Sequence, residues 1–284
     1  MAAGPGDRRG MPTFKSSAGP IHYLDSGAGP PIVFVHGLFV TGTMWRKVID
    51  PLSQRFRCIA PDLPLGAHKT AMNVGADLSP RTVARLIREM IESLDLEDVT
   101  MVATDTGGAI TQLLLADGCD RIGRVVLTPC DSFDNFLPMS IRVFQYWARV
   151  PGTDFVLLPF KLKLAQRALG KSLAKHSIPD EVLGEWVRPL LQDKAVRRDV
   201  RAFLSRIDYH DTLAAAETLR GFDKPVLLLW PRKVPFFPFA HAQRWVQLLP
   251  DAKLIEVPDS YTFVSEDQPE LMTQEIEAFV SQRV

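Results

Sequence analysis

Cysteine is scarce in this chain of 284 residues, which contains only Cys58, Cys119 and Cys130. An odd, sparse set cannot form the paired framework of a disulfide-rich secreted domain, so we expect a reducing, cytoplasmic location. An excess of either charge is also missing, because 33 Lys and Arg residues balance 33 Asp and Glu residues. A neutral chain has no electrostatic basis for binding nucleic acid.

Long apolar runs and ligand-binding motifs are missing as well. No stretch approaches the roughly 18 apolar residues that span a membrane, so we expect no membrane partner. A Gly-rich phosphate loop, a dinucleotide fingerprint and metal-ligand spacing are all absent, so we expect no metal and no organic cofactor. The Gly-, Pro- and Arg-rich residues 1–12 predict a flexible tail rather than a signal peptide, because they contain no apolar core.

Strand and helix patterns alternate through most of the chain. Apolar runs typical of strands buried on both faces alternate with helical patterns, and this order predicts an α/β fold with a mostly parallel central sheet and helices on both faces. The predicted strands are residues 13–25, 32–35, 57–62, 99–103, 124–128, 224–230 and 252–257, and the predicted helices are residues 43–54, 79–94, 109–116, 239–249 and 266–282.

One region interrupts this alternation. Residues 135–219 show only helical patterns, and residues 135–205 carry twelve Lys and Arg against six Asp and Glu. One interpretation is a set of solvated helices around a small core. The other is a helical lid over the carboxyl ends of the strands, where α/β folds bind ligands. We therefore divide the chain into a core (residues 13–134 and 220–284) and a helical lid (residues 135–219).

A short stretch between the fourth buried strand and the next helix carries the chemistry. Asp105 follows the strand directly, and the small residues Gly107 and Gly108 open the helix behind it. A sharp strand-to-helix turn with one reactive side chain at its tip is a nucleophile elbow, of which Gly-x-Ser-x-Gly is the usual form. The alternative is that Asp105 only caps the helix by accepting its free backbone N–H groups.

The order of these motifs resembles the α/β-hydrolase superfamily over nearly the whole chain, from about Thr13 to Gln282. The motifs are Pro-Ile-Val-Phe-Val-His-Gly, Ala-Pro-Asp-Leu-Pro, the elbow, the helical insertion, Lys-Pro-Val-Leu-Leu-Leu-Trp and Phe-Val-Ser-Glu-Asp-Gln-Pro. An aspartate at the elbow is similar to the haloalkane dehalogenase and epoxide hydrolase branch. The resemblance implies that this carboxylate attacks carbon and forms an alkyl ester.

Two partners that the resemblance implies are replaced. The histidine that activates water for ester cleavage belongs before the Phe-Val of the last loop, where Thr262 stands. The acid that orients the histidine belongs after residues 226–230, where Val234 stands. Some relatives carry the acid one strand earlier, and there the matching position is Pro129, two residues before Asp131. Asp131 and Asp134 are therefore candidate acids, and His210 is the best-placed substitute base among the remaining histidines.

Other parts of the implied site are present. The backbone N–H groups of Leu38 and Thr106 would form an oxyanion hole. These two side chains also stand where dehalogenases carry halide-binding residues, so dehalogenation is disfavoured. The predicted substrate pocket consists of His36, Thr104, Tyr146, Tyr209, Tyr261 and Thr262.

Three hypotheses follow. A non-hydrolytic enzyme would use Asp105 as a base for proton abstraction, elimination, isomerisation or cyclisation of a small, largely apolar molecule, as in a biosynthetic tailoring step, because burial raises the pKa of a carboxyl. An epoxide hydrolase-like enzyme would need a relocated histidine. A pseudoenzyme would bind a ligand without turnover. We expect the first of these, with a small-molecule partner, and leave the oligomeric state open.

Overall fold

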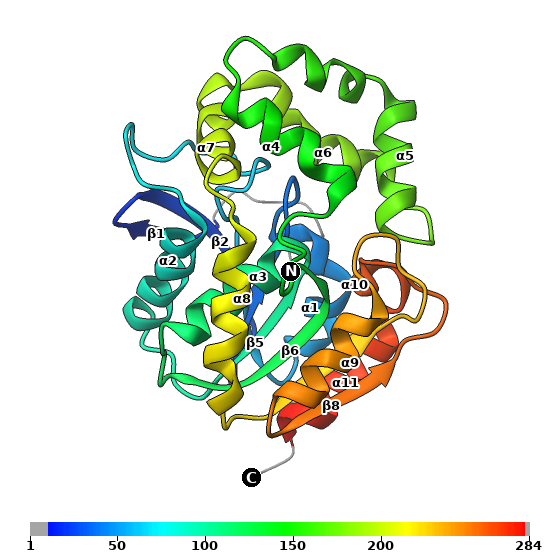
Figure 1. Cartoon of the computed structure of the whole chain (residues 1–284). Helices are drawn as coiled ribbons and strands as arrows, with labels where there is room; N and C mark the ends of the chain where they lie inside the picture. Colours follow the sequence, from blue (N-terminus) through cyan, green and yellow to red (C-terminus); the bar gives the residue numbers. More distant parts are fainter. Residues whose placement is uncertain (1–10, 282–284) are drawn as a thin grey trace.

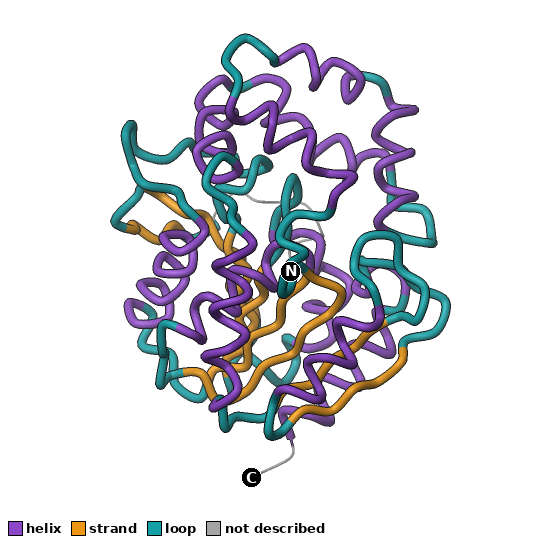
Figure 2. Tube along the Cα trace, in the orientation of Figure 1, coloured by secondary structure: helices purple, strands orange, loops and turns teal. Residues whose placement is uncertain are grey.

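A single sheet organises the computed structural model, which describes residues 11–281 (Figures 1 and 2). Residues 1–10 of the predicted tail lie outside the described residues. The strand order is β1-β2-β4-β3-β5-β6-β7-β8. All pairs from β4 to β8 are parallel, whereas β2 pairs antiparallel with β1 and β4. The strands are β1 (Thr13–Ser16), β2 (Gly19–Ser26), β3 (Pro31–Val35), β4 (Arg57–Pro61), β5 (Val99–Thr104), β6 (Ile122–Cys130), β7 (Val226–Trp230) and β8 (Ala252–Glu256).

Helices cover both faces of this sheet, and the predicted α/β-hydrolase fold is confirmed. The flanking helices are α1 (Arg46–Leu52), α2 (Pro80–Ser93), α3 (Asp105–Ala116), α8 (Tyr209–Thr218), α9 (Phe239–Leu248), α10 (Val264–Asp267) and α11 (Pro269–Ser281). Successive residues of a strand point to opposite faces of the sheet, so neighbouring side chains of β5 enter different core clusters. Met101 packs in the cluster that includes α2, α3, α8 and α9, and Val102 packs in the cluster that includes α1 and α11.

The first predicted strand differs from the structure. Residues 13–25 form the hairpin of β1 and β2 rather than one strand, because the chain turns before Gly19, whose φ of +139° only glycine adopts readily. The predicted start of the second long helix is confirmed: Ser79 caps α2 by accepting a hydrogen bond from the backbone of Thr82, and Pro80 occupies the first helical position.

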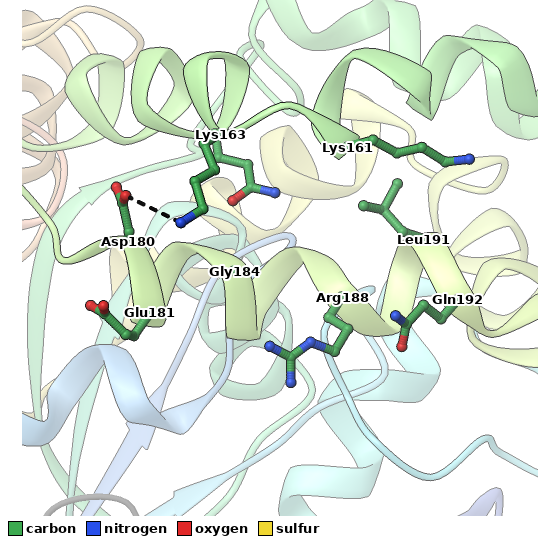
Figure 3. A pocket seen from close by; sticks show the side chains of 9 residues that line it. Lys161, Lys163, Asp180, Glu181, Gly184, Arg188, Leu191 and Gln192 are labelled. Carbon is green, nitrogen blue, oxygen red and sulfur yellow. Dashed lines mark ion pairs between the residues drawn. The ribbon is translucent and has the colours of Figure 1, made fainter.

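Between β6 and β7 the chain forms only helices and 3-10 turns, apart from one isolated bridge at Ser132 and Asn135. We call residues 139–204 the cap, which lies over one edge of the core in Figure 1. Its α5 and α6 border a pocket of about 390 Å³ shown in Figure 3. The cap contains α4 (Arg142–Arg149), α5 (Lys163–Leu173), α6 (Asp180–Gln192) and α7 (Lys194–Leu204), with 3-10 segments η2 (Met139–Ile141) and η3 (Asp154–Lys161).

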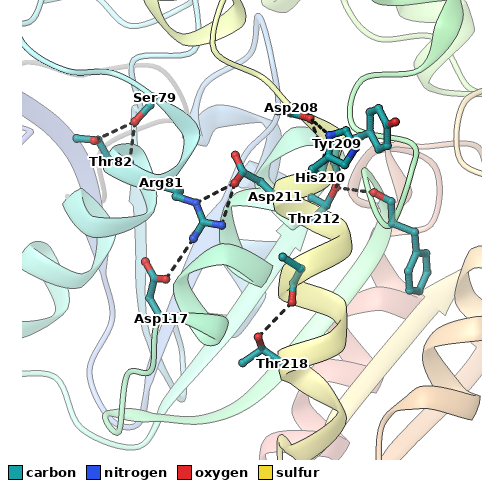
Figure 4. Close-up of polar contacts among 12 residues, drawn as sticks. Ser79, Arg81, Thr82, Asp117, Asp208, Tyr209, His210, Asp211, Thr212 and Thr218 are labelled. Carbon is teal, nitrogen blue, oxygen red and sulfur yellow. Dashed lines mark hydrogen bonds and ion pairs between the residues drawn. The ribbon is translucent and has the colours of Figure 1, made fainter.

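The last helix of the predicted lid lies in the core. α8 packs against α3 on the sheet, and its Asp211 accepts hydrogen bonds from Arg81 of α2 (Figure 4). Thr212 of α8 donates to the backbone oxygen of Phe133. The helical layer above the sheet therefore ends before α8, although the sequence pattern is helical up to residue 219. Periodicity identifies a helix but not the layer in which it packs.

Two buried aspartates join the cap to the core. Asp199 of α7 accepts hydrogen bonds from the backbone N–H of Met72 at 2.8 Å and from His68 Nε2 at 3.3 Å, both in the loop that precedes α2. The side chain of Arg198 pairs with the same carboxylate. Charge-assisted bonds of this kind are stronger than neutral ones, so this joint fixes α7 to the core.

The second joint is Asp267, at the end of α10. Its carboxylate accepts backbone N–H bonds from Lys175 (2.9 Å) and His176 (2.8 Å) after α5, and from Tyr261 (2.9 Å) in the last loop. Ser260 also donates to it. The same carboxylate therefore sets the position of the last loop, which contains Thr262, and of the end of α5.

We predict that Asp267→Ala lowers the free energy of unfolding by about 3 kcal/mol, because it leaves three backbone donors without their charged acceptor. Urea denaturation measures this change. The exposed Asp120→Ala is the matched control and should change stability by less than about 0.5 kcal/mol. Equal effects of the two substitutions would contradict the role assigned to Asp267.

Candidate active site

Asp105 lies at a strained turn between β5 and α3. Its φ is +52°, in the left-handed region that non-glycine residues rarely adopt, and it forms an isolated β-bridge with Cys130. Strain of this kind persists only where the surrounding structure imposes it, and it is typical of a nucleophile elbow. A carboxylate that serves only as a helix cap needs no such backbone.

The turn is held by close backbone approaches. A methyl group at Gly37 would overlap the carboxyl group of Asp105, and one at Gly107 would lie 2.5 Å from the backbone oxygens of Val35 and His36. Glycine is therefore required at both positions. The Asp105 side chain lies directly against the backbone of the turn after β3.

This carboxyl is both desolvated and hydrogen-bonded. Asp105 is 8% exposed, and burial raises its pKa to about 7, although hydrogen bonds from Thr106 and from the backbone N–H of Leu38 oppose the increase. The predicted oxyanion-hole donors thus donate to Asp105 itself. A carboxyl that titrates near neutral pH can both take up and release a proton under physiological conditions.

A second buried carboxyl lies beside the first. Asp131 follows β6 and is fully buried; its Oδ2 accepts a hydrogen bond from the hydroxyl of Thr106 at 2.9 Å, and its backbone N–H donates to the backbone oxygen of Asp105 at 3.2 Å. Burial, and then the charge of Asp105, raise the pKa of Asp131 well above its usual value, against the effect of the Thr106 bond. Its Oδ1 has no hydrogen-bond partner among the described residues.

The hydroxyl of Thr106, the residue directly after Asp105, donates to Asp131 at 2.9 Å. Burial raises the pKa of both acids above the usual value of an aspartate. Two close carboxyls in a desolvated site do not both ionise.

Thr262 and Thr104 meet at the same end of the sheet. The hydroxyl of Thr104 is shared between the backbone oxygens of Pro129 (3.2 Å) and Thr262 (3.4 Å). Thr262 is fully buried, and its hydroxyl has no hydrogen-bond partner among the described residues. Thr104 thus places the last loop, with Thr262, next to the elbow.

The histidines are engaged elsewhere. All six lie in the described part of the chain, and none forms a hydrogen bond with Asp105 or Asp131. His36 is buried and neutral, with Nδ1 donating to the oxygen of Gly37 and Nε2 accepting from Leu63, and burial lowers its pKa to about 4. The other five bond to or contact residues away from the elbow: His22 with Thr13 and Thr70, His68 with Asp199, His176 with Asp259, His210 with Asp208, and His241 with the ring of Phe133.

The remaining predicted site residues lie apart. Tyr146 is 70% exposed on α4, and Tyr209 is partly exposed and stacks on His210 at the start of α8. Tyr261 is partly buried and donates its backbone N–H to Asp267. None of these side chains bonds to Asp105, so the pocket roles of the tyrosines and the role of His210 as a base stay predictions.

Sequence reasoning missed the role of Gln112. This residue of α3 is buried, and its amide donates to the backbone oxygen of Asp131 at 2.8 Å and to Ser132 at 3.2 Å. It holds the loop that carries Asp131. A glutamine inside an otherwise apolar helix was the available signal, because a buried amide needs partners.

Within residues 11–281, no group of three His, Cys, Asp or Glu side chains is arranged to hold a metal ion. In the same part of the chain, no helix combines the length and apolarity needed to cross a bilayer.

Comparisons with known proteins agree with the fold. Residues 32–275 match the sequence profile of the alpha/beta hydrolase family. The chain is 29% identical over 273 residues to haloalkane dehalogenase 2 of Mycobacterium tuberculosis, covering 90% of each protein. A stretch of 108 residues, 38% of this chain and 37% of that protein, is 34% identical to a soluble epoxide hydrolase of Corynebacterium. A crystal structure of a haloalkane dehalogenase from Bradyrhizobium elkani superimposes with a TM-score of 0.78 at 18% identity, covering 96% of this chain and 97% of the other, which shows a shared fold alone.

The raised pKa of Asp105 predicts a specific dependence of stability on pH. The folded-state pKa of about 7 lies above the value near 3.9 of an unfolded aspartate, so the folded protein binds this proton more tightly. The stabilisation is complete below about pH 4 and is lost as the pH rises to 7. The loss amounts to about 4 kcal/mol.

Asp105→Asn removes this titration. We therefore expect the variant to gain stability relative to the natural protein as the pH rises from about 4.5 to about 8, measured by urea denaturation. Asp120→Asn, at an exposed position, serves as the control. A stability difference that stays constant across this pH range would show that Asp105 is not perturbed.

Proposed function

Because the chain belongs to the alpha/beta hydrolase family, we propose that it is an enzyme for a small molecule, in which Asp105 moves a proton instead of driving hydrolysis. The reaction class is proton abstraction, elimination, isomerisation or cyclisation, and it would suit a tailoring step in a biosynthetic pathway. Asp105 acts as the base, and Asp131 stores a proton next to it.

One observation carries this proposal. Asp105 is a buried carboxyl with a pKa of about 7, the next residue, Thr106, donates to a second buried carboxyl, and no histidine bonds to either acid. This arrangement supplies a base and an acid but no imidazole to activate water. General acid–base catalysis of this kind contributes about 10²- to 10⁴-fold to a rate.

The surroundings of the elbow favour a largely apolar substrate. Phe39 follows the oxyanion-side turn, and its ring packs on Phe144 of α4 with centroids 5.0 Å apart. Phe144 in turn contacts Phe160 of η3 at 6.0 Å. We propose that the cap acts as a lid whose inner side presents these rings to the substrate. The unpartnered hydroxyl of Thr262 then offers a single polar contact.

The backbone donors fit the same mechanism. The N–H groups of Leu38 and Thr106 hold the carboxylate of Asp105 in one orientation and favour its charged form. A base held in this way needs little rearrangement before it takes a proton from carbon. The proton then lies on Asp105, where it can return to a different atom of the substrate.

Hydrolysis through an alkyl ester is the second candidate. It is favoured by the similarity over 90% of the chain to a protein named haloalkane dehalogenase 2. In that mechanism Asp105 attacks carbon, but Thr262 cannot activate the water that would cleave the ester. Without another base the ester would persist, and a protein that binds its ligand without turnover is the limiting case.

The first test measures hydrogen exchange. The protein, incubated in deuterated water with a panel of small apolar ketones and esters, should incorporate deuterium next to the carbonyl group of its substrate, detected by mass spectrometry. Asp105→Asn should lower the rate by at least about 100-fold. Asp120→Asn should leave it unchanged. Equal exchange by the natural protein and Asp105→Asn would refute the proposed role of the carboxyl.

The second test distinguishes a base from a nucleophile. An aryl epoxide and a chloroalkane are incubated with the protein, and the intact mass, the diol and the released halide are measured. We expect no diol, no halide and no adduct. A lasting adduct on Asp105 would establish attack on carbon without release, and sustained diol formation would establish hydrolysis; either result overturns the proposal.

Thr262→His supplies the missing imidazole. If Asp105 can form an ester, this variant should release it and convert an adduct into turnover, since it restores a base next to the elbow. Thr262→Val has a similar volume to threonine and no base, and it is the matched control. Release by both variants would mean that another group activates the water.

A further inference from the structure

We propose that the outer surface of the cap, residues 139–171, docks on the surface of an anionic lipid bilayer. The inference is independent of the chemistry proposed for Asp105. It begins from an uneven distribution of apolar side chains. Seven of the ten exposed large apolar residues in the described part of the chain fall in this segment: Met139, Val143, Tyr146, Phe155, Leu158, Leu162 and Leu164.

The spacing of these residues gives the cap an apolar outer side. Met139, Val143 and Tyr146 lie four and three residues apart, along one side of η2 and α4. Trp147 next to them points inward and is buried. Tyr146, which is 70% exposed, therefore lies on this outer side.

The second half of the segment repeats the arrangement. Phe155 and Leu158 lie three residues apart in η3, which places them on the same side of a 3-10 helix, while Leu157 is buried. The contact between Phe144 and Phe160 joins α4 to η3. In Figure 1 the chain between α4 and α5 forms the top of the cap, on the side away from the sheet.

Positive charge accompanies the apolar side chains. Residues 139–171 contain six Lys and Arg residues but only one acidic residue, Asp154, in a chain whose net charge is zero. Asp154 is already paired with Arg197 and Arg201 of α7. The segment therefore presents no unpaired negative charge.

Four of the six cations form no ion pair with a described residue. Lys163 and Arg167 share Asp180 of α6, and Figure 3 shows Lys163 directed at this carboxylate while Lys161 has no such partner. The cations without an ion pair are Arg142, Arg149, Lys161 and Lys171. Each Lys or Arg near an anionic membrane strengthens binding about fivefold.

Apolar side chains among cations without ion pairs match the surface of an anionic bilayer. On such a surface, apolar side chains enter the boundary between headgroups and acyl chains, and cations bind the anionic headgroups. A second copy of the same segment fits less well, because it would bring like charges together. This proposal revises the expectation of no membrane partner, which considered spanning segments alone. A bilayer would also concentrate a largely apolar substrate next to the cap.

Vesicle co-sedimentation tests the proposal. The full chain should sediment with vesicles of equimolar phosphatidylcholine and phosphatidylglycerol, and remain in the supernatant with phosphatidylcholine alone. Salt at about 0.5 M should release most of it, because screening shortens the reach of the charges. Protein that stays in the supernatant with both vesicle types would overturn the proposal.

Variants locate the contact. Phe155→Ser/Leu158→Ser should weaken vesicle binding at least about tenfold, because both apolar side chains leave water on docking. Arg142→Gln/Lys161→Gln should weaken it about 25-fold, because two cations near the headgroups are lost. The controls are Val74→Ser and Lys233→Gln, an exposed apolar residue and an exposed cation outside the segment, which should bind like the natural protein. All these positions are exposed, and thermal unfolding checks that each variant is folded.

A different partner on the outer surface of the cap would give different experimental results. If the surface joins two copies of the chain, analytical ultracentrifugation will show a dimer that Phe155→Ser/Leu158→Ser dissociates, without vesicle binding, and the proposal is wrong. Equal loss of binding in the control variants would also contradict it. Asp105→Asn should bind vesicles like the natural protein. A negative result for vesicle binding therefore says nothing about the proposed chemistry of Asp105, and the reverse also holds.

Discussion

The desolvation of one carboxyl group at a strained turn is the constraint on which the site depends. Asp105 has a left-handed backbone at the point where β5 ends and α3 begins, and Gly37 and Gly107, which carry no side chain, allow the neighbouring backbones to pack directly against this turn. Burial then makes ionisation costly, so this side chain holds a proton at a pH where most aspartates have lost theirs. Burial and the charge of Asp105 raise the pKa of the neighbouring Asp131 as well, and Thr106, the residue after Asp105, donates to Asp131.

Residues without a proposed catalytic role hold the loops around Asp105 and Asp131 in place. Gln112 holds the backbone after β6, Thr104 holds the last loop, and Asp267 ties that loop to the end of α5. His36, which the sequence offered as a pocket residue, uses both ring nitrogens for backbone contacts. The ring of His36 therefore ties the turn after β3 to the residues after β4.

The fold could be predicted from the sequence because the patterns that specify its strands and helices lie within short stretches of the chain. The buried run at 99–103 and the serine and proline that start α2 specify their elements within a few residues. The layer of α8, and the pairing of Asp131 with Thr106, depend on contacts between segments far apart in the chain, which periodicity does not encode. Matching by position places Pro129 where some relatives carry the acid, so the sequence leaves the role of Asp131 open. In the structure Asp131 bonds to Thr106 of the elbow, because the bridge between Asp105 and Cys130 extends the pairing beyond the predicted strand.

The attachment of the cap has a consequence for how this protein can diversify. Asp199 joins the last helix of the cap to the loop before α2, and Asp267 joins the end of α5 to the last loop. Cap side chains add contacts with the core, such as Trp186 with Thr43 and Phe144 with Phe39. Because most donors to the two carboxylates are backbone N–H groups, the side chains of Met72, Lys175, His176 and Tyr261 can be replaced without loss of these bonds, whereas the two aspartates cannot.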